Sequence, residues 1–129
     1  YIPKELDVFS DKVQMEIRKA VERAWRKEAK AYLPERVDYL AKKNNFSFNR
    51  VRVQNSKTRW GSCSVENNIN LSLHLMRLPG YLIDYVILHG LVHTKVKNHG
   101  RNFWQLLDSV SGNAKKLDRE VKEYRTQIY

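Results

Sequence analysis

The sequence HGLVHTKVKNHGRNFW occupies residues 89–104 and holds three of the chain's four histidines. His89 and His93 are four residues apart, a spacing that places two side chains on one face of an α-helix, one turn apart. His99 follows Asn98, a residue type that can adopt the left-handed conformation found at helix ends. We therefore expect the chain to turn at Asn98 and to carry His99 back toward the other two imidazoles. Three histidine ligands with one open position are typical of a catalytic zinc site.

One residue of this stretch departs from the usual chemistry of such a site. In the zincin motif His-Glu-x-x-His, the Glu is the general base that takes a proton from the attacking water. Gly90 stands at that position here and has no side chain. The sequence therefore predicts a metal site that lacks its usual base.

Length, charge and cysteine content restrict the class of protein. The chain has 129 residues, and we expect residues 1–129 to form a single domain with a real core. It begins with Tyr1, so we interpret it as a fragment or trimmed chain. Cys63 is the only cysteine, which excludes an internal disulfide. No stretch resembles a signal peptide or a membrane span, so we expect a cytoplasmic protein with no membrane partner.

The chain carries 24 Lys and Arg against 14 Asp and Glu, a formal net charge of +10. This excess is compatible with an acidic partner such as nucleic acid or a nucleotide, or with solubility alone. The basic residues are scattered rather than gathered in one run, so the two interpretations stay open.

Apolar residues keep a helical period in the first third of the chain, from Leu6 to about Lys43. Pro34 falls inside this pattern, and proline disrupts a helix interior. We therefore expect a break or kink at Leu33, giving one bent helix or a helix pair.

The middle third changes to the period of strands. Phe48 to Val53 suits a strand, residues 58–64 form a second extended segment, and residues 66–68 suit a hairpin turn. The apolar residues from Ile69 to Leu75 alternate strictly with polar ones and Met76, which predicts a half-buried strand. Together these segments predict a small antiparallel sheet of about three strands.

The last third reads as three helices. Pro79 suits a first helical turn, and we expect the metal-binding helix to run from there to about Lys97. A short helix follows from Arg101 to about Val110. A polar helix from Ala114 to about Thr126 closes the chain, with its apolar residues facing inward: Leu117, Val121 and Tyr124. The whole pattern predicts an α+β domain.

Several motifs in order and spacing resemble the YgjP-like metallopeptidase domain family, small zincins related to the SprT-like proteases. The resemblance is strong over about residues 50–105 and looser in the flanking helical regions. It rests on the following residues: Thr58-Arg59-Trp60-Gly61-Ser62-Cys63-Ser64, Asn70-Leu71, Tyr85-Val86-Ile87, the His89 and His93 pair, and Asn98-His99-Gly100 with Phe103-Trp104. The family's extra N-terminal β segment is absent here, in keeping with a trimmed chain.

The resemblance implies a small zincin-like fold and one Zn²⁺ ion as cofactor. It implies that His89, His93 and His99 are the zinc ligands and that the family's catalytic Glu falls on position 90. Gly90 therefore puts catalysis in doubt but not metal binding.

Other residues have a structural and a functional interpretation. Arg59 and Trp60, with Asn70, could bind substrate or could pack around the sheet. His74 is expected on the surface, with a cleft position as the alternative. Core packing is expected for Tyr85, although it lies one turn before His89 and could approach the metal face.

The remaining candidates lie at the sheet and in the last helices. We expect Cys63 to be buried and inert rather than reactive. Phe103 and Trp104 should pack the last helices against the metal-binding helix and hold His99 in place. As an alternative to His99, Glu120 or Glu123 could supply a late carboxylate ligand to the metal, as in gluzincins.

Two classes of function remain open. The first is a zinc metallohydrolase of peptidase type, acting on polypeptides that add to the edge of the sheet, and impaired because Gly90 replaces the general base. A variant of it hydrolyses nucleoside triphosphates, as some relatives described as UTP pyrophosphatases do. The second is a non-catalytic zinc-binding module for nucleic acid or protein partners, which Gly90 favours.

Overall fold

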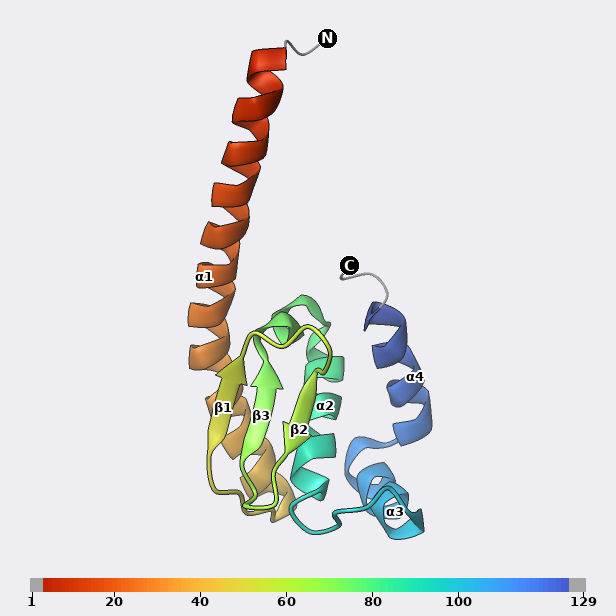
Figure 1. Cartoon of the computed structure of the whole chain (residues 1–129). Coiled ribbons are helices and arrows are strands. Elements are labelled where there is room, and N and C mark those ends of the chain that lie inside the picture. Colours follow the sequence, from red (N-terminus) through yellow and green to blue (C-terminus); the bar gives the residue numbers. More distant parts are fainter. Residues whose placement is uncertain (1–3, 126–129) are drawn as a thin grey trace.

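The computed structural model describes residues 4–125, with side chains described for residues 12–124. Four α-helices and one short 3-10 helix accompany a sheet of three strands (Figure 1). The elements in chain order are α1 (Lys4–Asn44), β1 (Val51–Gln54), β2 (Gly61–Cys63), β3 (Ile69–Ser72), η1 (Leu73–Arg77), α2 (Gly80–Val92), α3 (Arg101–Ser111) and α4 (Ala114–Arg125). The predicted α+β class and the number of strands are confirmed.

Helix α1 is a single helix that contains Pro34, so the alternative of a helix pair is wrong. Only its second half packs on the domain, and its first half projects beyond it (Figure 1). Ala29, Leu33 and Val37 are fully buried and lie four residues apart on one face of the helix. Arg36 follows Pro34 and donates two hydrogen bonds of 2.8 and 2.7 Å to Asp84 of α2. This pair ties α1 to α2.

The sheet is mixed, so the prediction of an antiparallel sheet is wrong for one of its two pairings. The strand order is β1-β3-β2, with β3 parallel to β1 and antiparallel to β2. The loop after β1 crosses the end of β3 to reach the far edge, and β3 then returns between the other two strands (Figure 1). Strand β3 lies between the other two and is the most buried strand. Ile69, Leu71 and Ser72 are all buried.

The predicted strand from Ile69 to Leu75 ends early, at Ser72. The Ser72 hydroxyl accepts the backbone N–H of His74 at 3.2 Å, which caps η1 instead of continuing the sheet. Leu73 and Leu75 are still fully buried. His74 is also buried, so the expectation that it lies on the surface is wrong.

Helix α2 is the most buried helix and lies at the centre of the domain. It contacts α1, the sheet strands β2 and β3, and both later helices. It ends at Val92 with His93 as its C-cap, five residues before the predicted end at Lys97. The hydroxyl and the backbone N–H of Thr94 both donate hydrogen bonds to the Leu91 carbonyl oxygen, at 2.6 and 3.0 Å. These bonds to the residue three positions earlier tighten the last turn and end the helix.

Helices α3 and α4 form as predicted within the described residues; the predicted end of α4 at Thr126 lies outside them. Val121 of α4 is buried, and Leu117 and Tyr124 pack against the core. No helix among residues 4–125 combines the length and the apolar character needed to cross a bilayer.

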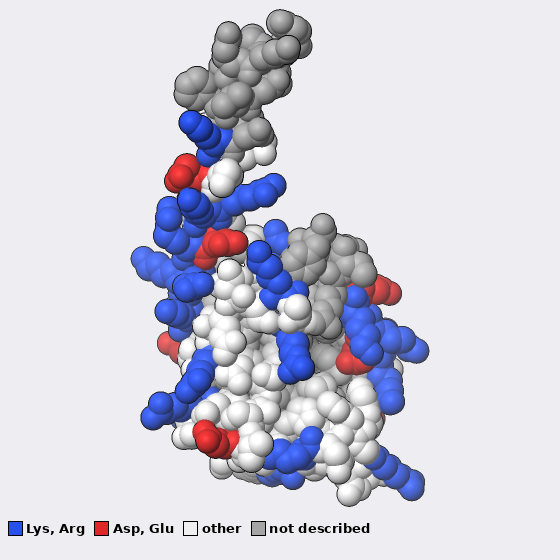
Figure 2. Space-filling model, viewed as in Figure 1, with Lys and Arg blue, Asp and Glu red and all other residues white. Residues whose placement is uncertain are grey.

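Positive charge is spread over the face of the molecule that Figure 2 shows. Figure 2 shows Lys and Arg side chains along the projecting part of α1 and on both flanks of the domain, with fewer Asp and Glu between them. This face of the molecule has no single concentrated basic patch.

Candidate metal centre

Three imidazoles converge at the C-terminal end of α2. One ring nitrogen from each of His89, His93 and His99 lies within 4.8 Å of the corresponding atoms of the others. His89 and His93 come from successive turns, with ring centroids 5.0 Å apart. His99 arrives from the loop that follows, and its Nε2 lies 3.0 Å from Nε2 of His93. The predicted juxtaposition of the three histidines is therefore present in the fold.

The loop does not turn in the predicted way. The non-glycine residues with positive φ among those described are Asn45 and Asn67, so Asn98 is not left-handed and that expectation is wrong. Its side chain makes the turn instead, because Asn98 Oδ1 accepts the backbone N–H of Gly100 at 3.2 Å.

Protonation of the rings suits metal ligation. His93 Nδ1 lies 3.0 Å from the Val96 carbonyl oxygen, which can only accept, so Nδ1 carries the hydrogen and Nε2 keeps its lone pair. Burial, followed by the neighbouring His93 and His99, lowers the pKa of His89 to about 4. Burial also lowers the pKa of His93. Three imidazole nitrogens that lie close together are a donor set that zinc sites commonly use, so these residues fit the metal.

The Phe103 ring packs against all three imidazoles of the cluster. It is fully buried, and its ring centroid lies 4.9 Å from His89, 4.4 Å from His93 and 4.9 Å from His99. Trp104 packs edge-on against it at 5.5 Å and is covered by the Lys115 ammonium at 4.1 Å. These contacts agree with the predicted packing role of the Phe103-Trp104 pair.

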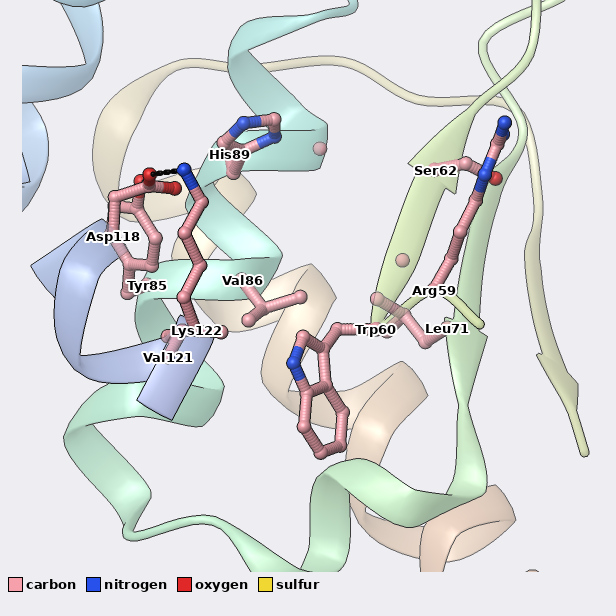
Figure 3. A pocket seen from close by; sticks show the side chains of 12 residues that line it. Arg59, Trp60, Ser62, Leu71, Tyr85, Val86, His89, Asp118, Val121 and Lys122 are labelled. Atoms are coloured by element: carbon pink, nitrogen blue, oxygen red, sulfur yellow. Dashed lines mark hydrogen bonds and ion pairs between the residues drawn. The ribbon is translucent and has the colours of Figure 1, made fainter. Parts of the chain in front are cut away.

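A cavity of about 180 Å³ opens beside His89 and Gly90. It lies between α2, α4 and the β2 edge of the sheet, with Val86 between the histidine and the tryptophan end (Figure 3). Arg59 and Trp60 line it, but Asn70 does not. Asn70 lines an adjoining depression, where it contacts Gln54 and Ser62.

An acidic residue that the sequence pattern did not single out also lines the cavity. Asp118 of α4 accepts the Tyr85 hydroxyl hydrogen at 3.1 Å and pairs with Lys122 at 2.9 Å (Figure 3). Burial, followed by Asp118, raises the pKa of Tyr85, which keeps the phenol a donor. The sequence did contain a signal that could have identified Asp118. Its spacing from Ala114 and Val121 places it on the same face of α4, so an acidic residue lies among inward-facing ones.

The remaining candidate residues lie away from the cluster. Among residues 12–124, the side chains close enough to form a three-ligand group are the three histidines, and neither Glu120 nor Glu123 joins them. Glu120 lies beside Tyr81 instead. His74 contacts Asn55 Oδ1 through Nε2 at 2.8 Å, outside the metal cluster.

Cys63 is a free, partly buried thiol. Burial raises its pKa, the direction expected of an unreactive cysteine.

Gly90 has room for a Cβ atom. A Cβ atom there would meet Ile69 at 3.6 and 3.7 Å, which is ordinary van der Waals contact. The packing around α2 therefore does not require glycine at this position.

The fold and the histidine cluster together define a small metallopeptidase-like α+β domain. A family model described as "YgjP-like, metallopeptidase domain" matches residues 2–124, and the chain belongs to this family. No match was found among curated protein sequences.

Two solved structures share the fold. The metallopeptidase zymogen jannalysin of Methanocaldococcus jannaschii superposes with a TM-score of 0.59 at 22% identity, over 70% of this chain and 93% of that one. The zymogen abylysin of Pyrococcus abyssi gives a TM-score of 0.60 at 21% identity, over 69% of this chain and 91% of that one. At these identities the likeness concerns the fold alone.

Proposed function

We propose that this chain is a zinc-dependent metallohydrolase of peptidase type in which His89, His93 and His99 hold one zinc ion. The observation that carries the proposal is the convergence of three ring nitrogens within 4.8 Å, beside a cavity. Membership of a metallopeptidase family supports the same reaction class. A zinc ion bound by three imidazoles lowers the pKa of a coordinated water and polarises a scissile carbonyl.

The chain's own residues would orient the substrate. Strand β2 is an edge of the sheet, and its residues Gly61 and Ser62 line the cavity next to His89. An extended polypeptide can add to such an edge through backbone hydrogen bonds. Trp60 and Arg59, which also line the cavity, then offer an apolar and a cationic contact to its side chains. Polypeptide is therefore the substrate class we favour.

The proton acceptor is missing from its usual place. Gly90 follows the first ligand on α2 and lines the same cavity, so a glutamate there could reach the attacking water. Without that carboxylate, we expect hydrolysis to be weak or absent while metal binding persists. Gly90 also favours the second candidate, a zinc-binding module that recognises a protein or nucleic acid without turnover.

One experiment separates the two candidates. The zinc-loaded chain and its Gly90→Glu variant are compared on unfolded polypeptides, short peptides and nucleoside triphosphates, with zinc content measured in both. A general base contributes about 100-fold or more, so the variant should exceed the parent by that factor on polypeptides. Turnover confined to nucleoside triphosphates would assign the phosphoanhydride reaction instead. A folded, zinc-loaded Gly90→Glu variant that is inactive on all three classes would favour the binding module.

A further inference from the structure

The loop between His93 and His99 is tied to the sheet by one side chain. Lys97 Nζ donates to the Ser64 carbonyl oxygen at 3.1 Å and to Asn67 Oδ1, and it lies 3.9 Å from Cys63 Sγ. All three partners belong to β2 or to the turn that joins β2 to β3. Lys97 is 33 residues from Ser64 in the chain, so this contact joins two distant segments.

The turn that receives Lys97 is well organised. Asn67 holds φ at 65°, a conformation that asparagine tolerates better than most residues. The Ser64 carbonyl also accepts the Asn67 N–H at 3.0 Å, and the Ser64 hydroxyl accepts the Asn68 N–H at 3.1 Å. The turn thus holds both acceptors in place, and an ammonium group donating to them fixes the loop against the sheet.

The other hydrogen bonds of the loop do not reach the sheet. The Val96 carbonyl oxygen bonds to His93 Nδ1, and Asn98 Oδ1 accepts the Gly100 N–H, so both bonds join near neighbours in the chain. Thr94 and Lys95 bond back to the last turn of α2. Among residues 94–98, within the described part of the chain, only Lys97 donates hydrogen bonds to β2 or to the β2–β3 turn.

His99 needs such an anchor more than the other two histidines. His89 and His93 are placed by the backbone of α2 and are partly buried, whereas His99 is exposed and lies six residues beyond His93. Lys97 is two residues before His99, so its attachment limits where that imidazole can lie. Residues that fix the orientation of a metal ligand commonly raise metal affinity.

We propose that Lys97 is a positioning residue of the metal centre, because it binds the β2–β3 turn and thereby holds His99 beside His93. This inference rests on the proposed zinc site. It predicts that the affinity for zinc depends on a lysine whose ammonium group faces the sheet rather than the metal cluster.

The test measures zinc affinity by chelator competition for the whole chain and for Lys97→Met, which keeps most of the side-chain length and removes the ammonium group. Loss of a residue that orients a metal ligand costs about 10-fold or more in metal affinity, and we expect a loss of that order from Lys97→Met. Asn67→Gly should weaken binding in the same direction, since glycine keeps the backbone at positive φ and removes one acceptor. Lys95→Met is the matched control, because Lys95 lies in the same loop but its ammonium covers Phe46 at 4.9 Å. It should bind zinc like the parent chain.

A double-mutant comparison with His99→Ala distinguishes positioning from general loss of structure. If Lys97 acts through His99, adding Lys97→Met to His99→Ala should cause no further loss of affinity. An unchanged affinity in Lys97→Met, or an equal loss with and without His99, would overturn the inference alone. A parent chain that binds no zinc would instead overturn the metal centre itself and the role of Lys97 with it.

Discussion

The Nε2 atoms of His93 and His99 lie 3.0 Å apart, although one residue caps a helix and the other belongs to an exposed loop. Since His93 already donates through Nδ1 to Val96, its Nε2 can only accept in the neutral ring. In a tetrahedral zinc site with bonds of 2.0–2.1 Å, two ligand nitrogens lie roughly 3.3 Å apart. The two histidines are therefore close to a spacing at which they can share a metal ion.

Phe103 should link the stability of the domain to its metal affinity. Phe103→Ala removes a fully buried ring that contacts all three histidines, so it should cost about 3–5 kcal/mol of folding free energy. It should also weaken zinc binding, because the imidazoles lose the surface on which they rest. Urea unfolding and chelator competition measure the two effects.

The control for this change is Leu107→Ala, one turn further along α3 and equally buried. It should cost about 2–5 kcal/mol of stability without altering the zinc affinity of the folded protein. Equal loss of zinc affinity in both variants would show that Phe103 has no specific role at the cluster.

Gly90→Ala should stabilise the protein by about 0.5–1 kcal/mol, because glycine is unfavourable in a helix interior and the new methyl group meets Ile69 at an ordinary distance. Gly61→Ala is the contrasting change, since its Cβ would lie 3.1 Å from Leu71 Cδ2 and 3.2 Å from the Asn70 carbonyl oxygen. We expect it to destabilise the sheet. Denaturant melts that rank the two variants the other way would contradict the packing described around α2.

Leu71 and Leu73 should both carry core stability even though only Leu71 lies in a strand. Each is at most 2% exposed, and truncation to Ala should cost about 2–5 kcal/mol. Val65→Ala, at a side chain 91% exposed, should change the free energy of unfolding by less than about 0.5 kcal/mol. A loss that small at Leu71 would mean that β3 presents its other face to the core.

The metal-free protein should lose stability as the pH falls from 7 toward 4. Burial lowers the pKa of His74, His89 and His93 in the folded state, that of His89 to about 4, whereas an unfolded histidine titrates near 6.5. Between these values the unfolded chain binds more protons, so acid favours unfolding. Urea midpoints in the presence of a chelator at pH 7.5, 6 and 5 measure the effect. His89→Gln should show a shallower dependence, and an equal slope in both proteins would exclude His89 as a contributor.

The sheet shows where reading the sequence was insufficient. Alternation identified β3 and its buried leucines, but the period of two is the same for parallel and antiparallel neighbours, so it could not predict that β3 lies between β1 and β2. The strand also ended early because the Ser72 hydroxyl offered the chain a local hydrogen bond that competes with the sheet. His74 was misplaced for the same reason, since alternation no longer applies once the strand has ended.

The sequence by itself determined the helices and the pairing of His89 with His93, because both depend on the local geometry of 3.6 residues per turn. It also located His99 as a third candidate and exposed the missing carboxylate at Gly90. Only the tertiary structure decided how His99 reaches His93, since this depends on a loop that Lys97 attaches to a turn 33 residues away in the chain. The same holds for Asp118, which enters the cavity because α4 packs across α2. Contacts between distant segments depend on the packing of whole elements, and no local pattern encodes them.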